Sequence, residues 1–444
     1  MVRKEGMMKI NKKFKQIALT AALLSVNTFV FAADNGTNSM SNDNSKDAKM
    51  KQKTMAPSLG DRMPPYPSPM SFVVDASFIY WQADVEDLDA GVQGNFDVNT
   101  DPSALTSGCS SDFGFHNSIK DINMDFKWEP GFKFGLGLVW GERDQYDLML
   151  NWTWIRPKAT ANSRTYDQLP AVNLATSLTP ANIASTLQAL VGGILEGAAI
   201  PGYASLFSGG PARHASSKWR LHYNTVDLEF GRNFFLGKNL TLRPHIGLRG
   251  AWLNQRLDNT YLPKLGTVAL GTPVSLGAFN VNSLAITNAT MNGEDEYHAV
   301  GLRAGADVYW NFTNHFAAYG KVSGSILYGY EEIEQNFTIN TSVNVSGIPG
   351  STSVNVNFPV DNNYRATSHT TKTTLQGILG LMWHTGFEDS GCHFYVSAGY
   401  EVNEWFHLNN FRTINENAFV FETKTIRKGN LGLHGLTVDV RLDF

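Results

Sequence analysis

The chain ends on the stretch NLGLHGLTVDVRLDF, residues 430–444, and this stretch decides the fold. Its last part places an apolar side chain at every second position, with polar side chains between them. The apolar row consists of Leu436, Val438, Val440, Leu442 and Phe444. A period of two predicts a β-strand with one apolar and one polar face. A terminal strand of this kind that ends on Phe is typical of the closing strand of a transmembrane β-barrel, although a soluble sheet could end in the same way.

The N-terminal residues have the pattern of a secretion signal. Lysines precede an apolar run at 17–33, and Val30 and Ala32 are small enough for a signal peptidase site. The run is short for a spanning helix, although a membrane anchor is the alternative. We therefore expect a signal peptide at 1–32, a disordered Pro-rich leader at 33–70, and the transmembrane β-barrel at 71–444.

Upstream of the terminal strand, period-two alternation recurs in pairs of segments that are joined by short polar links. The clearest pair covers 132–140 and 146–154 and is joined by GERDQ at 141–145. Such pairs predict antiparallel hairpins with a continuous apolar face. The other alternating segments are 72–80, 226–230, 240–249, 300–310, 316–326, 375–383, 394–402 and 436–444. We expect an all-β fold, an antiparallel transmembrane β-barrel of ten to sixteen strands, in which ten strands are clearest.

The connections between these segments alternate in length. Short links fall at 141–145, 232–238, 311–315 and 386–391, and long connections fall at 85–121, 157–216, 256–294, 331–366 and 408–429. Short periplasmic turns and long extracellular loops are typical of barrels in the outer membrane of Gram-negative bacteria. Two stretches inside a long connection, 337–347 and 351–358, either form one more hairpin or extend the loops.

Composition excludes several functions. The net charge of −4 and the absence of a basic stripe give no reason to expect nucleic acid. Only Cys109 and Cys392 are present, so the sequence predicts neither a disulfide framework nor a metal or cofactor site. Isolated histidines near strand ends, such as His214 and His369, have no diagnostic spacing, and we expect no enzyme activity.

The polar rows of the strands are expected to face the lumen. The candidate pore-lining residues are Lys133, Asp227, Glu229, Arg243, Arg249, Arg303, Asp307, Lys321, Glu401, Asp439 and Arg441. Such residues could line an aqueous channel and tune its selectivity, or they could pair with one another and close it. The near balance of signs predicts neither anion nor cation preference.

Three further features of the sequence predict where particular residues lie in the barrel. Residues 179–199 have the spacing of an amphipathic helix, which would constrict the lumen, cap the outer rim or lie at a subunit contact. Tryptophans near the strand ends suit interfacial girdles, namely Trp140, Trp152, Trp154, Trp252, Trp310, Trp383 and Trp405. Phe444 is the expected signal for the barrel assembly machinery.

Several stretches resemble a known family. Residues 72–91, FVVDASFIYWQADVEDLDAG, together with 128–138 and 144–157, resemble the major outer membrane protein family of Legionella and of Chlamydia-related bacteria. The resemblance implies a pore-forming outer-membrane protein without catalytic residues. Chlamydial members are rich in cysteine and cross-linked through it, whereas two cysteines argue against an extensive disulfide network here.

The sequence therefore predicts a porin-like barrel that passes small hydrophilic solutes and ions by passive diffusion. The alternative is a surface adhesin or structural barrel with a closed lumen. The expected partners are outer-membrane lipid, small solutes and the assembly machinery, and homo-oligomerisation is left open.

Overall fold

The structure is a computed structural model that describes residues 70–99, 114–141, 145–164, 172–173, 199–201, 212–263, 267–276, 279–347, 353–387, 392–417, 420–426 and 429–444. The chain divides into two compact units, Met1–Ala56 and Pro57–Phe444. The first unit, with the expected signal peptide and most of the leader, lies outside the described residues, as do Cys109 and nearly all of the expected helix at 179–199.

The described part of the second unit is built from strands. These are β1 (Met70–Val85), β2 (Asp89–Asn99), β3 (Gly114–Asn123), β4 (Asp125–Phe126), β5 (Trp128–Trp140), β6 (Tyr146–Ile155), β7 (Lys158–Asn162), β8 (Val172–Asn173), β9 (Ala199–Pro201), β10 (Ala212–Arg232), β11 (Phe234–Phe235), β12 (Leu240–Pro263), β13 (Thr267–Leu276), β14 (Phe279–Asn311), β15 (Phe316–Ser346), β16 (Val354–Phe387), β17 (Cys392–Asn409), β18 (Arg412–Asn417), β19 (Val420–Ile426) and β20 (Gly429–Asp443). Among the residues described, no helix is long and apolar enough to cross a membrane.

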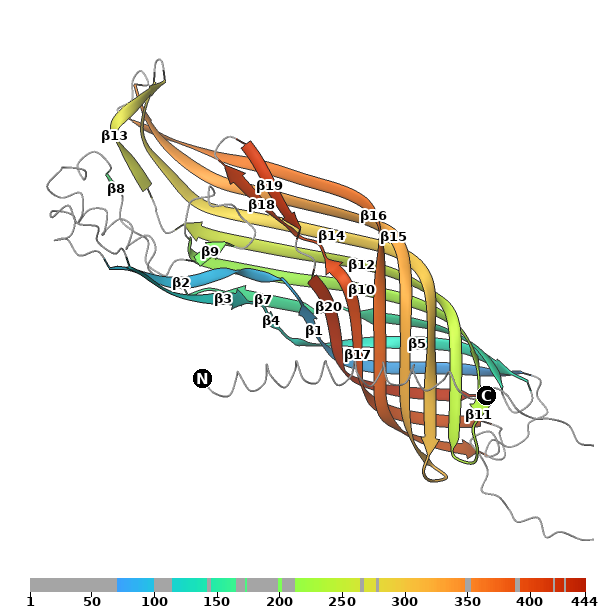
Figure 1. Cartoon of the computed structure of the whole chain (residues 1–444). Coiled ribbons are helices and arrows are strands. Elements are labelled where there is room, and N and C mark those ends of the chain that lie inside the picture. The colour runs from blue at the N-terminus through green and yellow to red at the C-terminus, as the bar shows by residue number, and fades with distance from the viewer. Residues whose placement is uncertain are drawn as a thin grey trace, which may run out of the picture. The chain divides into compact units, whose positions relative to one another are not determined.

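Ten of these strands close into a ring (Figure 1). Each pairs antiparallel with its neighbours in the order β1, β5, β6, β10, β12, β14, β15, β16, β17, β20 and back to β1. The predicted antiparallel β-barrel with ten clear strands is confirmed.

The terminal strand closes the ring as the alternation predicts. β20 pairs with β1 from Val73 opposite Asp443 to Val85 opposite Leu431. The backbones of Phe72 and Phe444 exchange two hydrogen bonds of 2.8 and 2.9 Å, so the last residue of the chain completes the seam.

The outer wall of the ring carries an apolar belt. Large apolar side chains on alternate residues are exposed, including Ile246 at 60%, Leu302 at 66% and Leu379 at 74%. An apolar surface of this extent is unfavourable in water and suits the hydrocarbon of a bilayer. The belt therefore defines the membrane-spanning part of the barrel.

Aromatic rows border the belt at both ends. At the end away from the short turns, the paired positions of β12, β14, β15 and β16 hold Trp252, His298, Tyr330 and His369. At the short-turn end, Trp310, Phe316 and Trp383 are exposed on the same face. These rows suit the two interfaces of the membrane.

Trp405 is an exception among the predicted girdle tryptophans. Its side chain is 0% exposed and packs inside the barrel, so its assignment to a girdle is wrong. Tyr400 and Val402 are on the outward row of β17, so alternation places Trp405 on the inward row with Glu401, and position near a strand end alone suggested the girdle.

Beyond the outer aromatic row, the expected long loops are largely strand. β14, β15 and β16 run for 33, 31 and 34 residues and continue in Figure 1 as long curved ribbons past the end of β20. Within these two stretches, 337–346 belongs to β15 and 354–358 to β16, and they pair from Thr341 opposite Phe358 to Val345 opposite Val354. They form no separate hairpin of the membrane barrel.

Candidate functional site: the barrel lumen

The inward faces of three neighbouring strands bring charges of both signs together. β10 contributes Asp227 and Glu229, β12 contributes Arg243 and Arg249, and β14 contributes Arg303 and Asp307. All six are buried, with 1 to 9% of their surface exposed. Small residues make room for them, since a Cβ at Gly305 would clash with His245 and Ser323 of the inward row.

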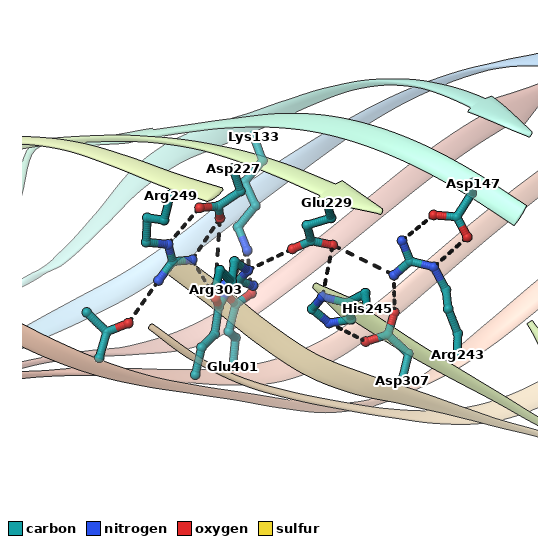
Figure 2. A network of polar contacts seen from close by, with 12 residues as sticks. Lys133, Asp147, Asp227, Glu229, Arg243, His245, Arg249, Arg303, Asp307 and Glu401 are labelled. Atoms are coloured by element: carbon teal, nitrogen blue, oxygen red, sulfur yellow. Dashed lines mark hydrogen bonds and ion pairs between the residues drawn. The ribbon is translucent and has the colours of Figure 1, made fainter. Parts of the chain in front are cut away.

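Arg243 is the centre of the cluster nearest the short turns. Its Nε donates to Asp147 Oδ2 at 2.7 Å, and its Nη1 donates to Asp307 Oδ2 at 2.8 Å. Nη1 also lies 3.7 Å from Glu229 Oε2. His245 lies between the last two carboxylates, at 3.7 Å from each (Figure 2). One guanidinium therefore holds carboxylates from three different strands.

Two further arginines continue the network away from the short turns. Arg303 Nε donates to Glu229 Oε1 at 2.7 Å, and its Nη1 lies 3.8 Å from Asp227 Oδ2. Arg249 binds Asp227 through two parallel hydrogen bonds of 2.6 and 2.7 Å. Bidentate pairs of this kind fix geometry and are the strong form of the ion pair.

The network crosses the lumen to the opposite wall. Arg249 Nη2 donates to Gln376 Oε1 at 2.9 Å, and Gln376 Nε2 donates to Glu401 Oε1 at 2.6 Å. Glu401 accepts from Lys133 Nζ at 2.7 Å. Contacts thus run without interruption from Asp147 on β6 through β12, β14, β10, β16 and β17 to Lys133 on β5 (Figure 2).

The charges in this network almost cancel. The cations are Lys133, Arg243, Arg249 and Arg303, and the carboxylates are Asp147, Asp227, Glu229, Asp307 and Glu401. Burying a charge is tolerable only where it is paired and hydrogen-bonded, and this arrangement meets that condition. Its near neutrality agrees with the balance of signs in the sequence.

The remaining three predicted lumen residues have other neighbours. Asp439 accepts from Ser397 Oγ at 2.9 Å, and Arg441 pairs with Asp443 at 2.6 Å. Lys321 lies 5.6 Å from the ring of Tyr319 and opposite the buried Asp307 in the register of β14 and β15, so it points inward, and its side chain is exposed. The lumen is therefore solvent-accessible beside Lys321, whereas most of the ion-pair network is buried.

An apolar layer fills the interior at and beyond the outer aromatic row. Trp81, Trp219, Tyr223, Trp405 and Leu433 are each at most 1% exposed and belong to one hydrophobic cluster. The rings of Tyr223 and Trp405 meet edge to face at 5.9 Å. In the described residues, the lumen is thus closed twice, by ion pairs at membrane level and by apolar side chains above them.

The segment 407–412, which joins the end of β17 to the start of β18, helps to seal this outer layer. Its residues 408–411 are buried, with Phe411 0% exposed. Lys372 Nζ donates to the carbonyl of His407 at 2.5 Å, and Gln335 exchanges two hydrogen bonds with the backbone of Arg412 at 3.0 Å each. We call residues 407–412 the inserted segment. It overlaps the long connection that the sequence predicted at 408–429.

Sequence reasoning found most of the polar network but missed the apolar layer. Period-two alternation identifies inward charged residues because they contrast with the apolar outer face. Trp81, Trp219 and Tyr223 gave no such contrast, because apolar residues on an inward face look like any buried strand. The described residues contain no cluster of three or more His, Cys, Asp or Glu that could hold a metal ion.

The closed ring, the apolar belt and the aromatic rows define the class of protein as a transmembrane β-barrel of the bacterial outer membrane. Residues 66–444 match the family described as Legionella pneumophila major outer membrane protein precursor, and the chain belongs to this family. No match was found among curated protein sequences.

Several solved structures are distantly similar to this chain. They include the outer membrane protease OmpT of Escherichia coli, at 9% identity and TM-score 0.28, covering 85% of this chain and 97% of that one. A FadL homologue of Pseudomonas aeruginosa matches at 10% identity and TM-score 0.22, covering 84% and 90%. The monoaromatic hydrocarbon channel CymD matches at 8% identity and TM-score 0.22, covering 84% and 88%. Likenesses this distant carry no inference about activity.

Proposed function

We propose that this outer-membrane barrel is a passive channel for ions and small hydrophilic solutes, with a lumen that is closed at rest. The observation that carries the proposal is the charged lining of the membrane-spanning interior. Ionisable residues at membrane depth are costly and usually mark a path for ions or polar solutes. A barrel that only had to be filled would be filled at lower cost by apolar side chains of similar volume.

Family membership supports the same function, because the resemblance seen in the sequence implies a pore-forming protein. Transport would need no chemistry. Solutes would be sorted by size and by the field of the lumen, and the near balance of charge predicts weak ion selectivity. We propose no catalytic role for the histidines or carboxylates.

Planar bilayer recordings on the purified protein test the proposal. We expect stepwise ohmic conductance of small unit size, because the ion pairs must separate before an aqueous path exists. Lys321→Glu reverses a charge in the solvent-accessible part of the lumen and should shift ion selectivity toward cations. Arg365→Glu, which makes the same change on the outer wall, is the matched control and should leave selectivity unchanged.

A second candidate function is that of a structural or adhesive surface barrel with a permanently closed lumen. The apolar layer and the inserted segment 407–412 favour it, since they close the lumen where an open porin would have its mouth. The same recordings separate the two candidates. Folded protein without conductance steps supports the surface barrel and contradicts the channel.

A further inference from the structure

A cluster of basic side chains lies on the outer wall of β7, β10 and β12 and on the link between β6 and β7. We define this basic patch as Arg156, Lys158, Lys218, Arg220 and Arg256. Lys158 lies opposite Arg220 in the register of β7 and β10, and Arg220 lies opposite Arg256 in the register of β10 and β12. Three cations thus stand side by side in one cross-strand row, where like charges repel unless an anion joins them.

The patch faces outward. Lys158, Arg220 and Arg256 have side chains that are 58, 54 and 53% exposed. Their sequence neighbours Ala159, Trp219 and Leu257 are at most 1% exposed and face the interior. Alternation therefore places all three cations on the wall that meets the surroundings of the barrel.

The aromatic row at the outer end of the apolar belt shows how far the patch lies from the hydrocarbon of the membrane. Asn224 lies opposite both Trp154 and Trp252, which belong to the outer end of the apolar belt. Lys158, Arg220 and Arg256 each lie four residues further along their strands, away from the short turns. Four residues correspond to about 13 Å along a strand. This is where the headgroups of the outer leaflet begin, since short turns face the periplasm.

Local carboxylates neutralise only part of the charge. Asp258 contacts Arg220 at 2.7 Å and Arg256 at 3.2 Å, and Glu129 contacts Lys158 at 3.0 Å. Two carboxylates thus contact the patch of five cations, and a third carboxylate, Glu294, lies opposite Arg256 at the edge of the patch. The excess is also felt by His222 beside the patch, whose pKa is lowered by partial burial and by the guanidiniums of Arg156 and Arg220.

The opposite charge dominates the neighbouring sector at the same height. In the cross-strand row, Arg256 is followed by Glu294, Glu334 and Arg365 on β14, β15 and β16. The next row holds Glu296 and Glu332. Among the described residues of these rows, the basic patch therefore borders a sector in which carboxylates outnumber cations.

We propose that the basic patch binds the phosphate groups of a phosphorylated glycolipid in the outer leaflet of the membrane. Guanidinium forks match phosphate oxygens bidentately, and basic residues at a membrane surface attract anionic headgroups. Trp154 and Trp252 lie directly below the cations, at the depth where indole rings meet the boundary of sugar and acyl chain. The occupant is a lipid, because the patch is continuous with the lipid-facing belt.

Binding to a defined glycolipid tests the proposal. The full-length protein in mixed micelles is titrated with a bisphosphorylated disaccharide glycolipid, and bound lipid is counted by native mass spectrometry. We expect saturable binding that is lost when the phosphates are removed from the same lipid. Arg220→Gln with Arg256→Gln should weaken binding about 25-fold, at about fivefold for each cation removed. Arg220→Lys with Arg256→Lys should retain most of it.

Arg365→Gln is the matched control, because Arg365 is an exposed arginine of the same cross-strand row in the acidic sector. It should leave glycolipid affinity unchanged. Equal affinity of wild type and the Arg220/Arg256 double variant would overturn the proposal, as would full competition by millimolar inorganic phosphate. Loss of an oligomer rather than of lipid in the double variant would overturn it too, and would assign the patch to contact with the acidic sector of a second copy.

Discussion

At the scale of single residues, Arg243 has the most consequential position in the lumen. It holds Asp147 and Asp307 by direct hydrogen bonds and lies near Glu229. Removing one partner of a buried ion pair leaves an uncompensated buried charge, which costs more than the pair itself contributes.

We predict that Arg243→Met lowers the free energy of unfolding by about 3–5 kcal/mol. Urea unfolding of the protein in lipid vesicles, followed by tryptophan fluorescence, measures the change. Arg365→Met, at a surface pair, should have no measurable effect. Adding Asp147→Leu and Asp307→Leu to Arg243→Met should recover stability, because no buried charge is then left unpaired. A loss that persists in the triple variant would contradict this account.

Asp295 is a second residue whose chemistry depends on burial. It lies beyond the outer aromatic row, is 2% exposed, and accepts a long hydrogen bond of 3.3 Å from Gln255 Nε2. Burial, followed by the nearby carboxylate of Glu331, raises its pKa well above the usual value. The folded state therefore retains a proton that the unfolded chain has already released.

The sign of the resulting pH dependence follows from that difference. The group favours folding at low pH, and this contribution is lost as the pH rises from the unfolded pKa of about 3.9 toward the raised folded pKa. Asp295→Asn abolishes the titration. We predict that the variant gains stability relative to wild type at pH 8 and gains less at pH 5, as measured by urea unfolding at both values. An equal difference at the two pH values would show that Asp295 titrates normally.

At the scale of elements, the terminal strand has two expected roles. It closes the ring against β1, and its last residue is the expected signal for the assembly machinery. The backbone of Phe444 completes the seam with Phe72, and the two rings stack at 6.3 Å. Phe444→Ser keeps the backbone bonds and removes the exposed ring, so it separates the two roles. Deletion of Phe444 removes both.

We predict that Phe444→Ser reduces the amount of barrel in the outer membrane of expressing cells about as much as deletion does. The inserted fraction should have unchanged unit conductance, since the ring points away from the lumen. Phe316→Ser removes an exposed aromatic ring at the same end of the barrel and is the control. Normal insertion of Phe444→Ser would rule out a role of the side chain as an assembly signal.

The strands differ in how well the sequence predicted them. Wherever one face meets lipid and the other is polar, as in 132–140 and 300–310, alternation predicted the strand, its face and its partner. Beyond the outer aromatic row, alternation continues in β15, where Phe337 and Ile339 share one face, but that face packs on the interior cluster instead of lipid. The pattern there predicted strands and could not decide between a further hairpin and extended loops. The inner layer around Trp219 was hidden, because the chain that covers it is distant in sequence.

At the scale of the whole molecule, a ring of ten strands determines what the lumen can be. About eight strands leave an interior that side chains just fill, and about sixteen leave an aqueous channel. A ten-stranded barrel lies near the filled end of this range. Any conduction therefore requires side chains to move. The ion-pair network and the apolar layer differ in what opening costs, because ion pairs can exchange partners whereas the apolar layer must lose packing.

The apolar layer is thus the expected main barrier. Trp405 is its largest member from β17 and packs edge to face on Tyr223. We predict that Trp405→Ala increases unit conductance in planar bilayers, because it opens a void in the layer, and that it lowers the free energy of unfolding by about 3–5 kcal/mol. Trp310→Ala, which removes the same side chain from the lipid face, should leave conductance unchanged. If Trp405→Ala folds and conducts as wild type, the barrier lies in the ion-pair network, and Arg303→Gln should then be the variant that opens it.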